Sequence, residues 1–295
     1  MKTSAATLPA TRSRVSDFVG LTKPRLNTLV VISTGIGYWL GAGGLDPALL
    51  FHTVVGAALV AGGAAALNQV AERDIDEAME RTRRRPIPSG CVQPGEARLF
   101  GVLLAGLGVT QLAVGANTLA AVVALATLVS YVAIYTPLKR KTRWATLIGA
   151  VPGALPPMIG WAAARGSLGV EAWVLFGIVF LWQVPHFHAL AWMYRDDFSR
   201  ANLPLLAVVD SDGRRNARHA MVFAAALLPM SIAPSLVGLT GRLYAGAALG
   251  FSVAFLILAW RFAEQPSTIR ARSLFMGSLV YLPLLWALLV IDSVF

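Results

Sequence analysis

The feature that most constrains how this chain can fold is the recurrence of apolar runs about 20 residues long. A helix of this length crosses the ~30 Å hydrocarbon core of a bilayer. The sequence therefore predicts an all-α, polytopic membrane protein with a single transmembrane domain over residues 1–295. About nine helices are expected, at residues 27–46, 49–69, 98–115, 117–136, 144–163, 172–194, 220–239, 243–262 and 274–294.

The composition excludes a soluble domain. Only 14% of the residues are charged, against roughly 25% in soluble proteins, so most of the chain does not face water. A formal net charge of +10 is also found in nucleic-acid-binding proteins. Here, however, the basic residues lie between apolar runs rather than on one face or tail. We therefore expect membrane lipids as surroundings and no nucleic-acid partner.

The distribution of Lys and Arg predicts the orientation in the membrane. If segment 1–25 is cytoplasmic and the helices alternate, 23 of the 25 basic residues are cytoplasmic and only Arg165 and Arg242 are not. This asymmetry follows the positive-inside rule, with a cytoplasmic N-terminus, a periplasmic C-terminus and cytoplasmic cap loops at 70–97 and 195–219. The first apolar run is longer than that of a cleaved signal peptide, which favours a bacterial inner-membrane protein. A short mitochondrial presequence is the alternative.

Acidic side chains gather in the two cap loops, and the first group begins where helix 49–69 ends. On a continuous helix Asn68, Glu72 and Asp76 lie at about 0°, 40° and 80°, so three oxygen-bearing side chains face one way. Such oxygens suit Mg²⁺, which is commonly shared with substrate phosphates. The alternative is a solvated helix end with acidic–basic pairs.

A second polar group ends helix 172–194. Trp182, His186 and Asp197 lie within about 60° of one another on a helix, whereas His188 points about 200° away from His186. Asp196 makes Asp197 part of a second acidic pair. Ionisable groups in a spanning helix usually face the bundle interior or a wet cavity. Each histidine is equally consistent with a neutral side chain that is hydrogen-bonded to a neighbouring helix.

Two further features flank these groups. Four cations follow helix 117–136 and suit either anionic lipid headgroups or a diphosphate: Lys139, Arg140, Lys141 and Arg143. Helix 144–163 contains prolines and glycines that exclude an unbroken helix: Gly149, Pro152, Gly153, Pro156, Pro157 and Gly160. Such breaks are tolerated beside a cavity, so this helix is a candidate cavity wall.

The motifs at these positions resemble the UbiA superfamily of intramembrane prenyltransferases, and within it the farnesyltransferases that act on haem. The resemblance is carried by Asn68–Asp76 with Arg81–Pro86, by Tyr135–Arg140, and by Trp182–Phe187 followed by Arg195–Phe198. It extends from Leu21–Arg25 to Arg272–Phe275 and so covers nearly the whole chain. Its most specific part is Trp-Gln-x-Pro-His-Phe followed by Asp-Asp.

The resemblance implies nine helices around a central cavity that the two acidic loops cap. It also implies transfer of a farnesyl group from farnesyl diphosphate to a vinyl group of haem B, which gives haem O. The chain departs from the family at one position. The family's first motif is Asn-Asp-x-x-Asp-x-x-x-Asp, and Gln69 stands where its first Asp would be. One carboxylate is therefore missing from the expected metal site.

The chemistry of an allylic diphosphate assigns roles to these side chains. The leaving diphosphate carries about three negative charges, which Mg²⁺ and basic groups stabilise. The expected catalytic residues and Mg²⁺ ligands are Asn68, Glu72, Asp76, Asp196 and Asp197; the expected diphosphate-binding residues are Arg84, Arg85, Lys139 and Arg140; the expected haem-binding residues are Trp182, His186 and His188. Expected partners are farnesyl diphosphate, haem B, membrane lipids, and haem A synthase or terminal-oxidase assembly proteins.

Three other functions fit part of the pattern. Another enzyme of the superfamily would prenylate an aromatic or quinone precursor. A transporter would also place polar residues in a helix bundle, but the charged residues here lie at helix ends rather than at the membrane midplane. A haem-binding assembly scaffold explains the histidines but not the two acidic loops.

Overall fold

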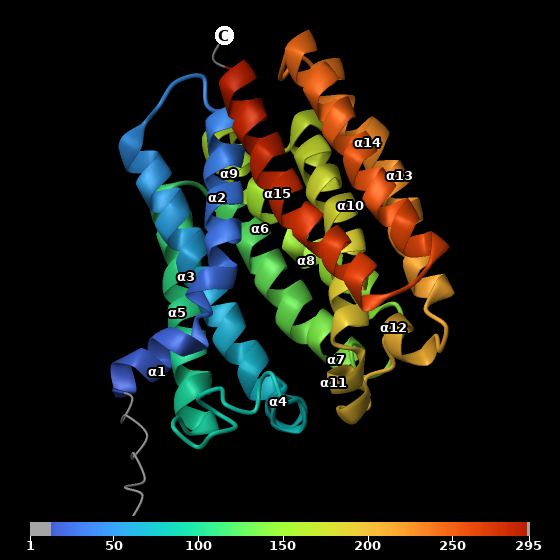
Figure 1. Ribbon diagram of the computed structural model, residues 1–295. Helices are drawn as coiled ribbons and strands as arrows, with labels where there is room; N and C mark the ends of the chain where they lie inside the picture. The colour runs from blue at the N-terminus through green and yellow to red at the C-terminus, as the bar shows by residue number, and fades with distance from the viewer. Residues whose placement is uncertain (1–12, 294–295) are drawn as a thin grey trace, which may run out of the picture.

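The structure, a computed structural model, describes residues 13–293 and is all-α over that range (Figure 1). Eight helical segments in this range are long and apolar enough to span a membrane: α3 (Pro47–Ala71), α5 (Pro94–Gly115), α6 to α7 (Thr118–Leu138), α8 to α9 (Ala145–Arg165), α10 (Val170–Met193), α13 (Arg214–Leu236), α14 (Arg242–Glu264) and α15 (Thr268–Asp292). The predicted all-α, polytopic membrane fold is confirmed, and the number of spans is close to the nine expected.

The first predicted span corresponds to α2 (Pro24–Gly41), which is not among these eight segments. Its first turns contain Arg25 and Asn27, two polar residues that lower its mean hydropathy. It begins earlier than the predicted residue 27 because Pro24 is suited to the first turn of a helix, where its missing N–H is not needed.

Two predicted spans are interrupted. The span after α5 consists of α6 (Thr118–Val129), a π-helix η1 (Ser130–Tyr135) and α7 (Thr136–Leu138). The proline-rich span is divided at Leu155 into α8 (Ala145–Ala154) and α9 (Pro156–Arg165), because Pro156 cannot donate a helical hydrogen bond. The prediction that this span is not a plain helix is confirmed.

Glycines allow α2 and α9 to approach each other closely. A Cβ atom at Gly37 would lie 1.9 Å from the carbonyl oxygen of Pro157, and one at Gly160 would lie 1.9 Å from that of Thr34. Any side chain at either position would force the two helices apart. These glycines therefore fix the backbone separation at this contact.

Short helices occupy the two predicted cap loops, and α1 (Arg14–Leu21) precedes the bundle. The first loop contains α4 (Arg73–Ala78), and the second contains α11 (Arg195–Arg200), α12 (Leu206–Val209) and the start of α13. Figure 1 shows α4, α11 and α12 together at one end of the bundle, opposite the C-terminal end of α15. We call this the cap end.

Candidate active site

The first acidic segment lies where α3 meets α4. Glu72 separates the two helices, with φ −104° and ψ 14°, so Asn68, Glu72 and Asp76 do not share the continuous helix that the sequence analysis assumed. All three side chains are nevertheless buried. A charged group removed from water needs a compensating partner, so the surroundings of the two carboxylates decide what this segment can do.

Each of these carboxylates is paired with a cation from a different part of the cap end. Lys139 Nζ lies 3.1 Å from both Oε1 and Oε2 of Glu72. Arg85 Nη1 donates to Oδ1 and Oδ2 of Asp76 at 2.8 and 2.7 Å. Both pairs are largely shielded from water. In such surroundings charge interactions are stronger than at a solvated surface. The alternative of a solvated helix end therefore does not describe Glu72 or Asp76.

Lys23 joins this cluster, although the sequence analysis assigned it no role. Its Nζ donates to Asn68 Oδ1 at 3.1 Å. Burial lowers the pKa of Lys23 from 10.5 to about 7; the positive charge of Arg85 adds to this effect, and Glu72 and Asp76 oppose it. The backbone of Lys23 is left-handed, with φ +48°, a conformation that is uncommon outside glycine and recurs at functional sites. In the sequence, the one sign of a role for Lys23 was its position in Leu21–Arg25, a segment that shares the family resemblance.

The π-helix η1 leads into the segment that carries Lys139. Asn68 Nδ2 donates to Thr136 Oγ1 at 3.1 Å, and Thr136 Oγ1 donates to the carbonyl oxygen of Tyr131 at 2.8 Å. Thr136 thus connects the end of α3 to the chain just before Lys139. Single π-helical turns within helices are rare and are frequent at functional sites.

The second acidic segment meets the first at the cap end. Asp197 Oδ1 accepts hydrogen bonds from the backbone N–H of Glu80, at 3.2 Å, and from Arg200. Burial acts to raise the pKa of Asp197, but the hydrogen bonds from Arg200 and the Glu80 backbone outweigh it and lower that pKa. The Asp196 side chain is 89% exposed and lies 3.8 Å from Arg195. The structure therefore brings Asp197, but not Asp196, to the contact between the two caps.

The other two basic residues predicted to bind diphosphate lie nearer to water. Arg84 is exposed. Arg140 pairs with Asp74, with Nη1–Oδ2 and Nη2–Oδ1 distances of 2.7 and 2.6 Å, and also donates to the carbonyl oxygen of Ala71. The hydrogen bond from Arg140 lowers the pKa of Asp74.

The predicted haem-binding residues separate into two places. His186 Nδ1 lies 2.7 Å from Ser278 Oγ on α15, and the ring packs between Trp182 and Phe275 at centroid distances of 5.3 and 4.7 Å. Trp182 Nε1 donates to the carbonyl oxygen of Ser278. His188 instead faces α13. The helical wheel correctly predicted that the two histidines point in different directions.

The donor set of the first acidic segment fits a hard cation. It offers the amide oxygen of Asn68 and the carboxylates of Glu72 and Asp76. Within residues 13–293, no three His, Cys, Asp or Glu side chains are grouped so as to hold a metal by themselves. Mg²⁺ commonly takes one or two carboxylates and completes its shell with waters and substrate phosphates. These residues therefore suit Mg²⁺ that is shared with a diphosphate.

The chain is similar to known enzymes over almost its full length. The UbiA prenyltransferase family matches residues 30–288. A protoheme IX farnesyltransferase from Solibacter usitatus is 46% identical, with 94% of this chain and 98% of the relative covered. The corresponding enzyme from Opitutus terrae is 45% identical, with 98% and 99% covered. That from Myxococcus xanthus is 40% identical, with 100% and 99% covered.

Solved structures share the fold at low sequence identity. A structure of digeranylgeranylglyceryl phosphate synthase matches with a TM-score of 0.80 at 14% identity, with 95% of this chain and 99% of that chain covered. A UbiA homologue from Archaeoglobus fulgidus, bound to GPP and Mg²⁺, matches with a TM-score of 0.68 at 14% identity, with 93% and 99% covered. With its motifs, its fold and its relatives all in agreement, this chain belongs to the UbiA prenyltransferase family.

Proposed function

We propose that this prenyltransferase transfers the farnesyl group of farnesyl diphosphate to a vinyl group of haem B and so forms haem O. Relatives at 40–46% identity over nearly their full length are protoheme IX farnesyltransferases. The observation that carries the proposal is the pair of buried carboxylates, Glu72 and Asp76, at the cap end of an apolar bundle, together with the partly buried cations beside them: Lys23, Arg85 and Lys139. These charged side chains are the proposed diphosphate ligands, and they lie at the end of apolar helices long enough to span a membrane, whose interior suits the apolar parts of both substrates.

The acidic–basic pairs can exchange partners when a diphosphate binds. Lys23, Arg85 and Lys139 then donate to phosphate oxygens, with Arg84 and Arg140 available nearer to water. This leaves the carboxylates of Glu72 and Asp76, with Asn68, as the proposed protein ligands of Mg²⁺, and Asp197 lies at the contact with the second cap. A metal contact by Asp196, whose side chain is 89% exposed, stays a prediction. When bound, Mg²⁺ supplies Lewis-acid stabilisation of the leaving diphosphate.

The reaction needs charge stabilisation more than acid–base catalysis. The C1–O bond of farnesyl diphosphate breaks, and the diphosphate keeps the electron pair. The π electrons of the haem vinyl group form the new bond to C1 through the terminal vinyl carbon. The cation left beside the porphyrin ring takes the oxygen of a water molecule, and one proton is released. Basic side chains held in place before the reaction lower its barrier, because they do not have to reorganise as charge develops.

Trp182 and His186 are the proposed contacts to the acceptor, since they form one aromatic group with Phe275. Basic residues near the membrane surface would pair with the haem propionates. For His188, which lies against a different helix, a role in haem binding stays a prediction. The proposed location is the bacterial inner membrane, with the cap end cytoplasmic and with transfer of haem O to haem A synthase or oxidase assembly proteins.

The test is a reconstituted reaction. Purified protein in lipid nanodiscs is incubated with haem B, farnesyl diphosphate and Mg²⁺, and the haem fraction is analysed by mass spectrometry. We expect a product heavier than haem B by one farnesyl group and one hydroxyl group. In a parallel reaction 4-hydroxybenzoate replaces haem B as acceptor. Prenylation of the aromatic acid without any change in haem would contradict the proposal and favour the quinone-precursor alternative.

A further inference from the structure

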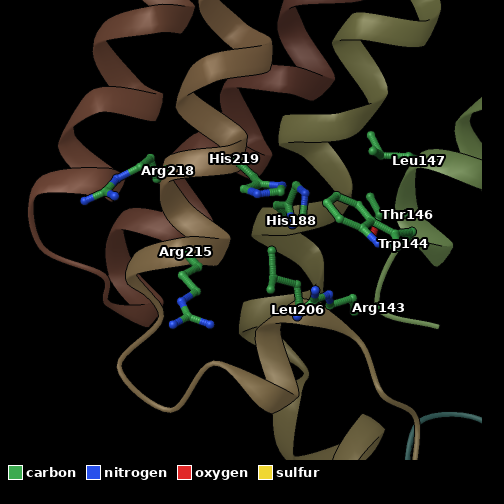
Figure 2. A pocket seen from close by; sticks show the side chains of 9 residues that line it. All are labelled: Arg143, Trp144, Thr146, Leu147, His188, Leu206, Arg215, Arg218 and His219. Carbon is green, nitrogen blue, oxygen red and sulfur yellow. The ribbon is translucent and has the colours of Figure 1, made fainter.

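A pocket of about 290 Å³ lies at the cap end, between the start of α8 and the start of α13 (Figure 2). Figure 2 shows His188 and His219 next to each other, with Trp144 beside them and arginines around this group. The lining residues are Arg143, Trp144, Thr146, Leu147, His188, Leu206, Arg215, Arg218 and His219. None of them belongs to the proposed diphosphate site, and only His188 is among the residues predicted to bind haem.

Three arginines line this pocket without an acidic partner. Among residues 13–293, Arg143, Arg215 and Arg218 form no ion pair and no side-chain hydrogen bond; the guanidinium group of Arg143 lies over the Trp144 ring at 5.7 Å. The nearby carboxylates are used elsewhere. Asp212 pairs with Arg214, and Asp210 Oδ2 accepts the backbone N–H of Asn216 at 2.9 Å. The pocket is therefore strongly positive and suits an anion.

His188 is an independent sign of a missing ligand. Its side chain is only 2% exposed, and Nδ1 lies 2.8 Å from Asn216 Oδ1. Asn216 Nδ2 donates to the carbonyl oxygen of His188, so its Oδ1 is the atom that faces Nδ1, and Nδ1 carries the proton. Nε2 is then a buried acceptor with no donor among the described residues, which is unfavourable unless a ligand supplies one.

The pocket lies at the ends of two apolar segments that are long enough to span a membrane, where lipid headgroups would meet the protein. Two membrane spans begin at it, Ala145–Arg165 and Arg214–Leu236. The rings of Trp144 and His219 lie 5.8 Å apart at this border. Tryptophan is enriched at membrane interfaces, and arginine near the surface attracts anionic lipids. An occupant of this pocket is therefore an amphiphile rather than a freely soluble anion.

We propose that this pocket binds the headgroup of an anionic phospholipid that carries free hydroxyl groups. The phosphodiester lies among Arg143, Arg215 and Arg218, and a headgroup hydroxyl donates to His188 Nε2. Leu206 belongs to α12, which follows Asp197 in the second cap. The bound lipid thus links α8 and α13 to the cap that carries one of the proposed active-site carboxylates.

The test compares three lipids on delipidated protein in detergent. Phosphatidylglycerol has the charge and the hydroxyl groups, phosphatidylmethanol has the same charge without hydroxyl groups, and phosphatidylcholine has neither. Binding is measured by native mass spectrometry and by the lipid-induced rise in melting temperature. We expect affinity to fall in that order. The triple variant Arg143→Gln, Arg215→Gln, Arg218→Gln should lose roughly fivefold in phosphatidylglycerol affinity per arginine.

Two further variants make the test specific. His188→Leu should bind phosphatidylglycerol and phosphatidylmethanol equally, which a purely structural role of His188 would not produce. Arg272→Gln removes an exposed arginine of α15 and should leave all lipid affinities unchanged. Retained binding of a farnesyl diphosphate analogue shows that each variant is folded.

Three outcomes would overturn the proposal. Equal phosphatidylglycerol binding by the triple variant and the wild type removes the arginines from the site. Displacement of the lipid by inorganic phosphate or diphosphate at equal concentration assigns the pocket to a soluble anion. If haem B binding, followed by its Soret band, is lost in the triple variant while lipid binding persists, the pocket belongs to the acceptor.

Discussion

Asp74 and Asp76 lie two residues apart in α4, but their surroundings differ. Asp76 is fully buried and bonded to Arg85, whereas the Asp74 side chain is 62% exposed and pairs with Arg140. We expect Asp76→Asn to lower kcat for haem O formation by about 10²-fold or more, because it removes charge at the centre of the proposed site. Asp74→Asn should lower it by less than about tenfold, since exposed ion pairs contribute little.

Both variants are compared at saturating farnesyl diphosphate and haem B, and their melting temperatures show whether each is folded. If a folded Asp76→Asn variant has wild-type turnover, the metal and the diphosphate bind elsewhere.

Lys23 makes diphosphate binding depend on pH in a defined direction. At pH 8 its amine is mostly neutral in the free protein, because its pKa is about 7 rather than 10.5. A nearby diphosphate favours the charged form and raises that pKa, so binding should take up close to one proton at pH 8 and little below pH 6. The proton number is measured by titration calorimetry with a farnesyl diphosphate analogue and Mg²⁺ in two buffers of different ionisation enthalpy.

The matched control is Lys23→Arg, whose guanidinium group stays protonated with or without the ligand. Subtracting its proton number from that of the wild type removes protons exchanged by the ligand itself. If the two numbers agree at pH 8, Lys23 does not respond to the diphosphate, and its proposed role is wrong.

Between elements, the contact of α2 with α9 depends on the absence of side chains. Gly160→Ala places a Cβ atom 1.9 Å from the carbonyl oxygen of Thr34, so the helices must separate, at a cost of about 1–3 kcal/mol. Gly250→Ala in α14 meets no atom within 4 Å and should leave stability unchanged or slightly higher. Melting temperatures in detergent micelles compare the two. Equal melting temperatures would show that α2 can shift without loss.

The break between α3 and α4 differs from the predicted continuous helix, but the same three side chains still gather at the proposed site. A continuous helix was expected to align Asn68, Glu72 and Asp76, yet the chain leaves helical geometry at Glu72. The three side chains still point into one buried region, because Lys23, Arg85 and Lys139 reach them from other segments. Their alignment therefore depends on tertiary contacts as well as on helical periodicity.

For the whole molecule, the charge distribution predicts the orientation in the membrane. A green fluorescent protein reporter fused in the first cap near Gln93 should be active, because we expect that segment to be cytoplasmic. An alkaline phosphatase reporter fused after Phe295 should be active, because we expect that end to be periplasmic. The physical reason is that 23 of the 25 basic residues lie on one side under this topology. Alkaline phosphatase and green fluorescent protein fusions measure this in cells. Finding both positions on the same side contradicts the proposed arrangement.

Local patterns along the chain were sufficient to predict that this is a membrane protein, that its fold is helical, and which residues make up most of the proposed site. Apolar length predicts spans because the hydrocarbon core of a bilayer is about 30 Å thick, and prolines predict the break between α8 and α9 because they cannot donate a hydrogen bond. Helical geometry also separates His186 from His188. Motif spacing identified Asp196 and Asp197, but not that the first is exposed and the second buried.

Contacts between segments that are far apart in the sequence could not be predicted from local patterns and are seen only in the folded structure. Lys23 is 45 residues from Asn68, and Lys139 is 67 residues from Glu72, yet each pair is hydrogen-bonded. Periodicity describes only neighbours within one helix, so it cannot show which cation compensates which buried carboxylate. That choice is made when the helices pack, because a buried charge is stable only where the surrounding elements bring a partner to it.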